Sequence, residues 1–410
     1  LIDVIDIEPL NEGEVAEIVF TIIGHKPSRE EITWLSNESG GNPELLIDIL
    51  QSIKRQDQSL DECVRSDVIP INQTLINSIQ NRLVELSELQ WRILFSAVIL
   101  GRQFPADLLE VVSAADPEDF ETSLQLLQNG RIIKRTHFSS RVDGYEFIHG
   151  VIYRFILQKI PPETKHLLNL RAISAYQNHA ADTLENHIFA AGLFEEAGLL
   201  EGALQHWISA GDKAKKKFHN EQVNQAFGNA LRITQLLGER CPEETIYLLV
   251  KNWAGYCVEN NDLQTSAMVY SRSMLIGQER KSERLIGFAE SGHALLEALL
   301  GNFQLAGELI NRSIERLKEA KQEGELARSY IIRGIQFTFQ GNLLESINDF
   351  STANEIFTHL VNNETDELVL LMTAYQVIAL SGLGRAGEAI ELAQRTIKMA
   401  ELRNHSNYGL

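Results

Sequence analysis

Three short stretches of the sequence combine residue types that could take part in binding chemistry. Gly41-Asn42-Pro43 stands between two helical patterns, where a helix stop followed by proline in the first turn of the next helix would also explain it. The segment Phe147–Arg154 places His149 where an alternating pattern becomes helical, and a capping or partly buried core histidine would also explain that position. Arg82-Leu83-x-x-Leu86, followed by Gly101-Arg102-x-Phe104, has core packing as its simpler explanation. Each stretch alone decides nothing, so its place among the surrounding elements must be considered.

The sequence lacks the motifs of an independent enzyme. A phosphate-binding loop needs G-x-x-x-x-G-K-[ST], and no Gly-Lys dipeptide occurs in the chain. H-E-x-x-H and G-x-S-x-G are also missing, and the 11 histidines include no i, i+4 pair that would grip a metal. Three widely spaced cysteines form no C-x-x-C pair and are expected to be reduced: Cys63, Cys241 and Cys257. We therefore expect no catalytic residue, no metal and no cofactor in this chain alone, and a cytoplasmic location.

The composition and net charge of the chain exclude some classes of binding partner. The 410 residues carry a net charge of −19 at 44% hydrophobic content, as in ordinary globular proteins long enough for two or three domains. Strong negative charge speaks against unspecific binding to nucleic acid or to an anionic membrane. No uninterrupted apolar run reaches the roughly 18 residues that would suggest a membrane span. A protein or small-molecule partner remains.

The first part of the chain has the pattern of a small helical bundle, from residue 11 to about residue 55. Ser28 stands three residues before Glu31, the spacing of a capping box at a helix start. Gly40 to Pro43 break that helix and begin another. The polar stretch 56–70 reads as a linker. The opening LIDVIDIEPL resembles the end of a strand, which suggests a fragment of a longer chain.

A helical pattern resumes at Leu75 and ends at Gly130, with a turn expected at Gly101–Pro105. Alternating segments at 131–135 and 144–148 then flank a polar tip from His137 to Asp143. Three helices followed by one β-hairpin are the layout of a winged helix.

Beyond Val151 the pattern is helical throughout, and it repeats. A turn residue is followed at +5 by a small residue, at +9 by a mostly bulky one and at +12 by another small one, which is typical of stacked helix pairs. The turn residues are Gly198, Asn261, Gly301, Gly341 and Gly384, the last four spaced by 40, 40 and 43 residues, and a degenerate copy runs through Val223, Phe227 and Ala230. The sequence therefore predicts a tetratricopeptide-like array with repeats longer than the standard 34 residues.

The order of these motifs resembles the signal-transduction ATPases with numerous domains (STAND), which are AAA-like regulatory ATPases. The resemblance rests on five segments in succession: IEPLNEGEVAEIV…SGGNPELLIDIL, IPINQTLINSIQNRLVEL, AVILGRQF, YEFIHGVIYRFIL and ENHIFAAG before the repeats. It implies a lid, a winged helix and superhelical repeats, without the P-loop domain that precedes them in the family. It also implies ATP or ADP in the full-length parent, with Gly41-Asn42-Pro43 on the adenine and His149 at the β-phosphate. Ile148-His149-Gly150 lacks the acidic neighbour of the immune-receptor form.

The sequence thus predicts a mostly α fold: a helical lid at 1–60, a winged helix with one β-hairpin and linker helices at 61–180, and an α-α superhelical repeat array at 181–410. We expect the sensor and inhibitory half of a nucleotide-driven switch that works with the P-loop domain and can self-associate with nucleotide. A right-handed superhelix would hold an inducer on its concave face, through polar or aromatic residues of each first helix: Tyr256, Asn260, His293, Arg333 and Tyr375.

Two other functions stay open. The repeats could be a plain scaffold for a partner protein with no switch. The winged helix could instead bind DNA. Between Arg82 and Lys159, however, nine Lys and Arg are balanced by ten Asp and Glu, so this segment has no excess of positive charge to neutralise DNA phosphates. The sequence names neither the output domain nor the inducer.

Overall fold

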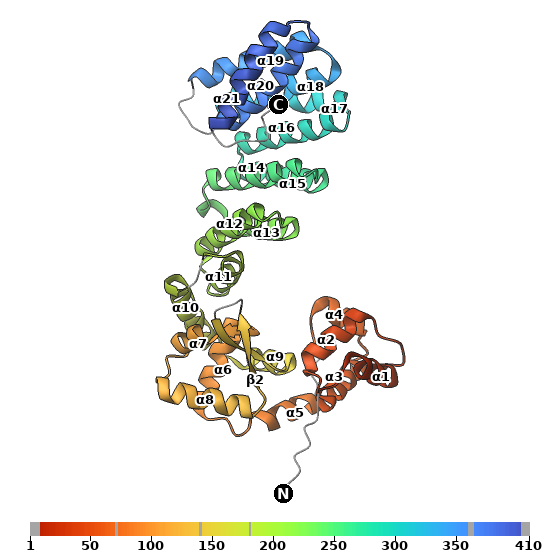
Figure 1. The fold of residues 1–410 in the computed structure, drawn as a ribbon, viewed down its shortest axis with the longest axis vertical. Helices are drawn as coiled ribbons and strands as arrows, with labels where there is room; N and C mark the ends of the chain where they lie inside the picture. The colour runs from red at the N-terminus through yellow and green to blue at the C-terminus, as the bar shows by residue number, and fades with distance from the viewer. Residues whose placement is uncertain (1–8, 70–72, 139–141, 180–181, 360–364, 403–410) are drawn as a thin grey trace. The chain divides into compact units, whose positions relative to one another are not determined.

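The computed structural model describes residues 9–69, 73–138, 142–179, 182–359 and 365–402 (Figure 1). It divides between Ala203 and Leu204 into two compact units, which are described separately. The strand-like start of the sequence, residues 1–8, lies outside the described residues. No helix of the described residues is long and apolar enough to cross a membrane.

The first unit begins with a helical bundle, here called the lid bundle. Ser28 and Glu31 form the predicted capping box, because the Ser28 hydroxyl accepts from the Glu31 amide at 3.2 Å and the Glu31 carboxylate accepts from the Ser28 amide at 2.6 Å. Val15, Leu35 and Leu46 are among its fully buried residues. The lid bundle consists of α1 (Glu12–Ile23), α2 (Arg29–Ser39), α3 (Pro43–Arg55), α4 (Leu60–Ser66) and α5 (Gln73–Leu83).

The prediction of a linker at 56–70 was wrong, because α4 lies within it. Leu60 and Cys63 are both 2% exposed and anchor this short helix to the core. Trp34 on α2 donates its indole N–H to Asp67 Oδ1 at 2.8 Å, just past the end of α4. The tertiary contacts of these two buried side chains therefore stabilise α4, a helix that its mostly polar sequence does not predict.

The sheet module follows and contains the predicted helices and hairpin. The predicted turn at Gly101–Pro105 was wrong in part, because β1 (Gln103–Pro105) is a strand that pairs antiparallel with β3 (Val142–Phe147), Phe104 opposite Tyr145. In the hairpin, β2 (Ile133–Phe138) pairs with β3 and Ile133 lies opposite Phe147. The sheet order is β1-β3-β2. The module consists of α6 (Glu88–Leu100), β1 (Gln103–Pro105), α7 (Ala106–Ser113), α8 (Pro117–Asn129), β2 (Ile133–Phe138), β3 (Val142–Phe147) and α9 (Gly150–Lys159).

The hairpin strands run further into the predicted polar tip than expected, to Phe138 and from Val142, while residues 139–141 of the tip lie outside the described residues. The core of the module continues into that of the lid bundle, since one apolar cluster includes Leu46, Ile93 and Phe147. Two further helices close the first unit, α10 (Pro162–His179) and α11 (Leu184–Glu196), and α12 (Leu200–Lys216) follows.

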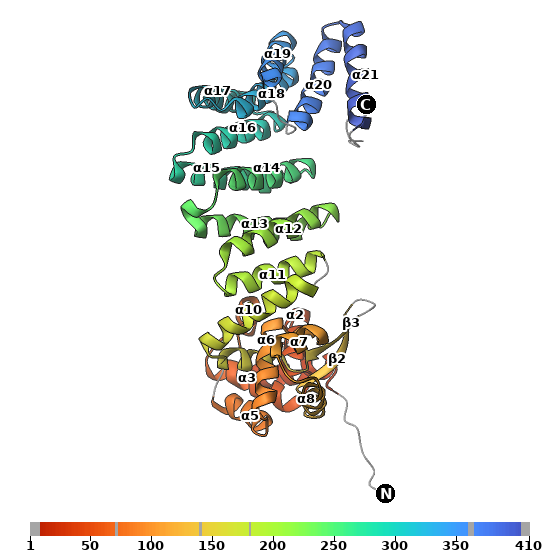
Figure 2. The same cartoon turned by 90° about the vertical axis from the view of Figure 1, so that its left-hand side faces the viewer.

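The second unit is a stack of antiparallel helix pairs (Figure 2). Each helix packs against the next, and the first helices of successive pairs also contact each other. For example, α16 (Glu283–Leu299) contacts α18 (Glu323–Gln340), and α18 contacts α20 (Thr365–Gly382). These are the contacts of a helical-repeat array. The unit contains α13 (Asn220–Leu237), a 3-10 turn at Gly238–Arg240, α14 (Glu243–Glu259), α15 (Leu263–Arg280), α16 (Glu283–Leu299), α17 (Phe303–Glu319), α18 (Glu323–Gln340), α19 (Leu343–His359), α20 (Thr365–Gly382) and α21 (Ala386–Leu402).

The turn residues of the repeats adopt the left-handed conformation that the pattern requires. Gly301 and Gly341 have φ of 82° and 78°, and Asn261 has 59°. In the degenerate copy Phe218 takes that place, with φ of 56°, which the sequence pattern did not reveal. The ladder residues after the turns are buried, including Tyr270 at 2% and Phe350 at 0% exposure, except Ala393 of the last repeat, which is half-buried. The predicted mostly α fold with helical repeats is confirmed.

Candidate functional site

One cavity of the first unit brings together the motifs that the sequence singled out. Gly41, Asn42, Pro43 and His149 all line it, although more than 100 residues separate the histidine from the first three. Its volume is about 1020 Å³. The lid bundle contributes one wall and the sheet module the other.

Local chain geometry explains the wall built from the lid bundle. Gly40 ends α2 in the left-handed conformation, with φ of 59°, and the Asn42 side chain accepts from the Leu45 amide at 3.0 Å as the N-cap of α3. Pro43 is the first residue of α3. The helix-stop explanation therefore holds, and the same residues line the cavity.

His149 joins the two walls. It precedes α9 at the N-cap position but makes no capping hydrogen bond, and it is 4% exposed. Its Nδ1 donates to the carbonyl of Ser39 at 2.7 Å. A Cβ on Gly40 would lie 2.5 Å from the Ile148 carbonyl and 2.6 Å from His149 Nδ1, so only glycine lets the sheet module approach this closely.

Cationic side chains of the sheet module complete the cavity: Arg102, Arg131 and Lys134. The single carboxylate among the lining residues, Glu146, pairs with Lys134 at 2.7 Å and accepts from the Gln103 amide at 2.7 Å. Partial burial alone would raise the pKa of Glu146, but the hydrogen bonds from Lys134 and Gln103 outweigh it and hold that pKa below its ordinary value. The cavity therefore keeps positive charge beside apolar and backbone surface.

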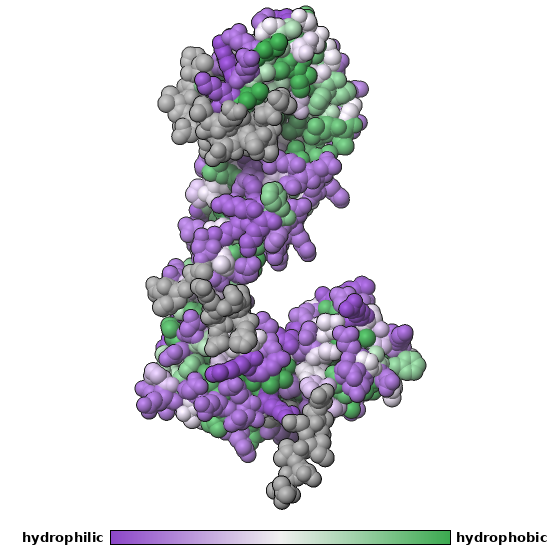
Figure 3. All heavy atoms as spheres, viewed as in Figure 1, coloured by the Kyte–Doolittle hydropathy of each residue, from purple (hydrophilic) through white to green (hydrophobic). Residues whose placement is uncertain are grey.

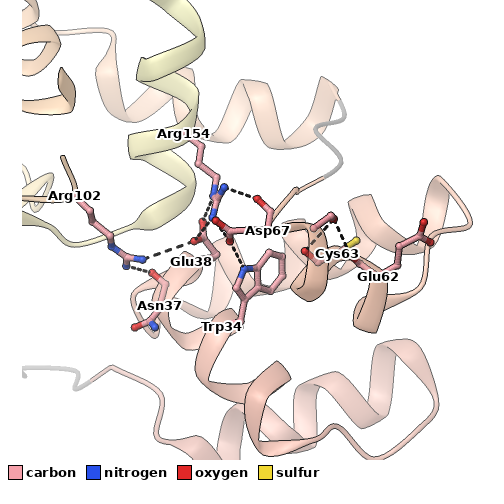
Figure 4. Close-up of polar contacts among 9 residues, drawn as sticks. Trp34, Asn37, Glu38, Glu62, Cys63, Asp67, Arg102 and Arg154 are labelled. Atoms are coloured by element: carbon pink, nitrogen blue, oxygen red, sulfur yellow. Dashed lines mark hydrogen bonds and ion pairs between the residues drawn. The ribbon is translucent and has the colours of Figure 1, made fainter. Parts of the chain in front are cut away.

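A buried ionic network lies next to the cavity (Figure 4). Glu38 on α2 is 2% exposed, and Arg154 on α9 grips its two oxygens with Nε–Oε2 at 3.1 Å and Nη2–Oε1 at 3.2 Å. Arg154 also donates to the Asp67 carbonyl at 2.6 Å and to the Asp67 carboxylate. Arg102 approaches Glu38 at 3.7 Å and donates to the Asn37 carbonyl. Two arginines of the sheet module thus hold the end of α2.

Gly150 fits this network because it has no side chain. A Cβ there would lie 2.6 Å from both carboxylate oxygens of Glu38. Gly150 is also the first residue of α9, where the helix dipole favours a negative group. A carboxylate therefore does stand beside Gly150, the residue after His149, but α2 of the lid bundle supplies it.

Sequence reasoning gave no role to Glu38, Asp67, Arg131 or Lys134. One signal could have pointed to Glu38: a carboxylate at the C-terminal end of a helix opposes the helix dipole, and α2 offers no Lys or Arg within four residues of it. Such a residue needs a partner from another element. The position of that partner follows only from the fold.

The five residues proposed as a ligand face all lie in the second unit. Tyr256 is 6% exposed and donates to Asn220, while Asn260 caps α14 and donates to the Tyr256 carbonyl at 2.9 Å. Arg333 is bound bidentately by Asp349 at 2.7 Å and also donates to Asn311. The Arg333 guanidinium therefore already has partners within the chain, Asp349 and Asn311.

The other two residues of the predicted ligand face are half-buried. His293 Nε2 lies 3.2 Å from Ser271 Oγ, and burial lowers the pKa of His293 despite the neighbouring Glu297. Tyr375 packs edge-on against Phe339 with ring centroids 5.7 Å apart, and burial raises its pKa. The ligand face stays a prediction. No group of three or more His, Cys, Asp or Glu among the described residues could hold a metal ion.

No described protein family matches the chain, and no curated protein does either. Among solved structures, it is similar to a STAND protein with a tetratricopeptide repeat sensor from Pyrococcus horikoshii, at 15% identity and a TM-score of 0.43; the match covers 98% of this chain and 55% of that one. The chain thus spans about half the length of that protein. Apo RapI is similar at 12% identity and a TM-score of 0.41, covering 94% and 87%.

Aspartyl phosphate phosphatase F from Bacillus subtilis is similar at 10% identity and a TM-score of 0.36, covering 98% of this chain and 93% of that one. At such identities these are similarities of fold, and no ligand or activity of this chain follows from them.

Proposed function

We propose that this chain is the sensor and inhibitory part of a nucleotide-switched regulator. The first unit would close over ADP together with a P-loop domain of the same natural protein, and the repeats would receive a protein or small-molecule inducer. One observation carries the proposal: Gly41-Asn42-Pro43 and His149 line the same cationic cavity.

The residues present suit a nucleoside diphosphate. Arg102, Arg131 and Lys134 line the cavity with one carboxylate, Glu146, which pairs with Lys134. Arg102 also contacts Glu38 and Asn37, so Arg131 and the remaining donors of Arg102 and Lys134 would make charge-assisted hydrogen bonds to an anionic ligand. Pro43 offers an apolar ring to a base. Bound ADP would supply the diphosphate charge that the cations neutralise, while the chain's own residues bind and orient it.

The switch would lie in the contact between the lid bundle and the sheet module. His149 and Arg154 reach α2 from the sheet module, so both bonds must break if the modules separate. An inducer on the repeats shifts the population only if it binds the open arrangement more tightly than the closed one. The alternative, a scaffold without a switch, needs no nucleotide.

Titration of ADP into the natural full-length protein by calorimetry tests the proposal. Alanine at both Arg131 and Lys134 should weaken ADP binding about tenfold or more, since each charge-assisted bond contributes about 1.5–3 kcal/mol. Arg92 and Arg171 are exposed cations of the same unit that do not line the cavity. Alanine at both should change the affinity for ADP by less than about twofold. A full-length protein that binds no ADP would refute the switch and leave the scaffold.

A further inference from the structure

Apolar side chains are exposed at the turns between the first and second helices of two successive repeats. At the α16–α17 turn Leu300 is 60% and Leu305 45% exposed, and at the α18–α19 turn Leu344 is 64% exposed. With Leu299 at 40% and Phe339 at 42% they are here called the leucine edge. Single exposed apolar residues are ordinary on protein surfaces, but five at neighbouring turns need an explanation.

These two turns are neighbours in space. α16 and α18 pack against each other, and Gln336 on α18 donates its amide to the carbonyl of Phe303 at 2.9 Å, at the start of α17. Figure 3 shows apolar residues gathered over α16, α17 and α18. The start of α17 is also hollowed, by about 570 Å³, and Leu305 and Glu308 line that hollow. The leucine edge is therefore one surface with a depression in it.

Charge at this edge has a single sign. Residues 255–269, 295–309 and 335–349, which span three successive turns, contain no Lys or Arg. They contain six carboxylates, of which Asp349 is bound by Arg333: Glu259, Asp262, Glu297, Glu308, Glu345 and Asp349. The opposite turns of the same repeats carry cations: Arg280, Lys281, Arg316, Lys318 and Lys321. The three turns at the leucine edge therefore carry carboxylates alone, whereas the opposite turns carry charges of both signs, since Glu279, Glu283, Glu319 and Glu323 accompany these cations.

We infer that the leucine edge is a docking surface for a basic amphipathic helix of a partner protein. The apolar face of such a helix would cover the leucines, and its Lys and Arg would meet Glu297, Glu308 and Glu345. A second copy fits less well, because a two-fold contact would set these carboxylates against themselves. This inference goes beyond the proposed switch, because it needs neither nucleotide nor the first unit.

Fluorescence anisotropy on the 410-residue chain tests it, with a labelled synthetic amphipathic helix of Leu and Lys, about 14 residues long, at about 0.15 M salt. The probe should bind, and the same peptide with Glu for every Lys should not. Leu300→Ser with Phe339→Ser should weaken binding about tenfold or more. Glu308→Lys with Glu345→Lys should weaken it similarly, without removing any apolar group.

The matched control is Leu236→Ser with Leu275→Ser, since these leucines are 57% and 58% exposed on α13 and α15, away from the edge. It should change the affinity by less than about twofold. Equal weakening by the control pair, or equal binding of the Glu peptide, would overturn the inference. Dimers of the wild-type chain that Leu300→Ser dissolves would overturn it in favour of a second copy.

Discussion

His149 Nδ1 donates a hydrogen bond of 2.7 Å to the carbonyl of Ser39, a residue 110 positions earlier in the chain. The bond ties the N-cap residue of α9 to the last residue of α2, directly beside Gly40 to Pro43. Both motifs that the sequence offered as weak and separate signals thus belong to one structural contact. That contact forms an edge of the cationic cavity.

Gly150→Ala should separate the modules. Its Cβ would stand 2.6 Å from both oxygens of Glu38, so we expect a loss of about 1–3 kcal/mol of unfolding free energy, measured by urea titration. In a Glu38→Ala background the same change should be neutral or stabilise by up to about 1 kcal/mol, because alanine favours a helix over glycine. An equal loss in both backgrounds would show that the clash with Glu38 is not the cause.

Glu38→Gln should lower the free energy of unfolding by about 1.5–3 kcal/mol, because it leaves the Arg154 guanidinium without its buried carboxylate partner. The loss should persist at about 1 M salt, which screens exposed pairs but not this one. Glu30→Gln on the same helix is the control, since Glu30 is exposed. If both substitutions had the same small effect, the network would not stabilise the contact between the modules.

Repeat packing predicts opposite effects for two helical glycines. A Cβ at Gly292 would lie 2.3 Å from the Tyr270 ring, whereas a Cβ at Gly255 meets nothing within 4 Å. Gly292→Ala should therefore lower the free energy of unfolding by about 1–3 kcal/mol. Gly255→Ala should leave it unchanged or raise it by about 0.5–1 kcal/mol. Thermal melting of the two variants decides this; a stable Gly292→Ala protein would contradict the packing described here.

Burial lowers the pKa of His293 from its ordinary value of 6.5, against the opposing effect of Glu297. The folded state then binds fewer protons at this site than the unfolded state, so stability rises with pH through that window and falls as the pH drops below about 6.5. Replacing His293 by Gln should flatten the dependence of the melting temperature on pH between about 7.5 and 5.5. An unchanged slope would show that His293 titrates normally in the folded chain.

Local signals predicted much of the fold. Ser28 and Glu31 identify a helix start by spacing alone, and the turn-to-ladder spacing of Gly301, Ala306 and Ile310 identifies a repeat, because both patterns depend on neighbours in the chain. β1 escaped prediction because three residues carry no periodicity, and its strand conformation depends on pairing with β3.

The candidate site was only partly predictable for the same reason. Gly41-Asn42-Pro43 and His149 stand out as local irregularities. Glu38 and Arg154 lie in ordinary helical positions and are 116 residues apart in the sequence. Their pairing depends on how the lid bundle packs against the sheet module.

Nucleotide retained by the natural full-length protein tests the central claim most directly. The protein is purified, denatured, and its released nucleotide is measured by chromatography. Wild type and His166→Ala, which changes an exposed histidine of the same unit, should each release about one ADP per chain. His149→Ala should release far less, because it removes the proposed charge-assisted hydrogen bond from the His149 imidazole to the diphosphate. Loss of about 1.5–3 kcal/mol weakens ADP binding roughly ten- to a hundredfold. Equal ADP in wild type and His149→Ala, or none in wild type, would contradict the account.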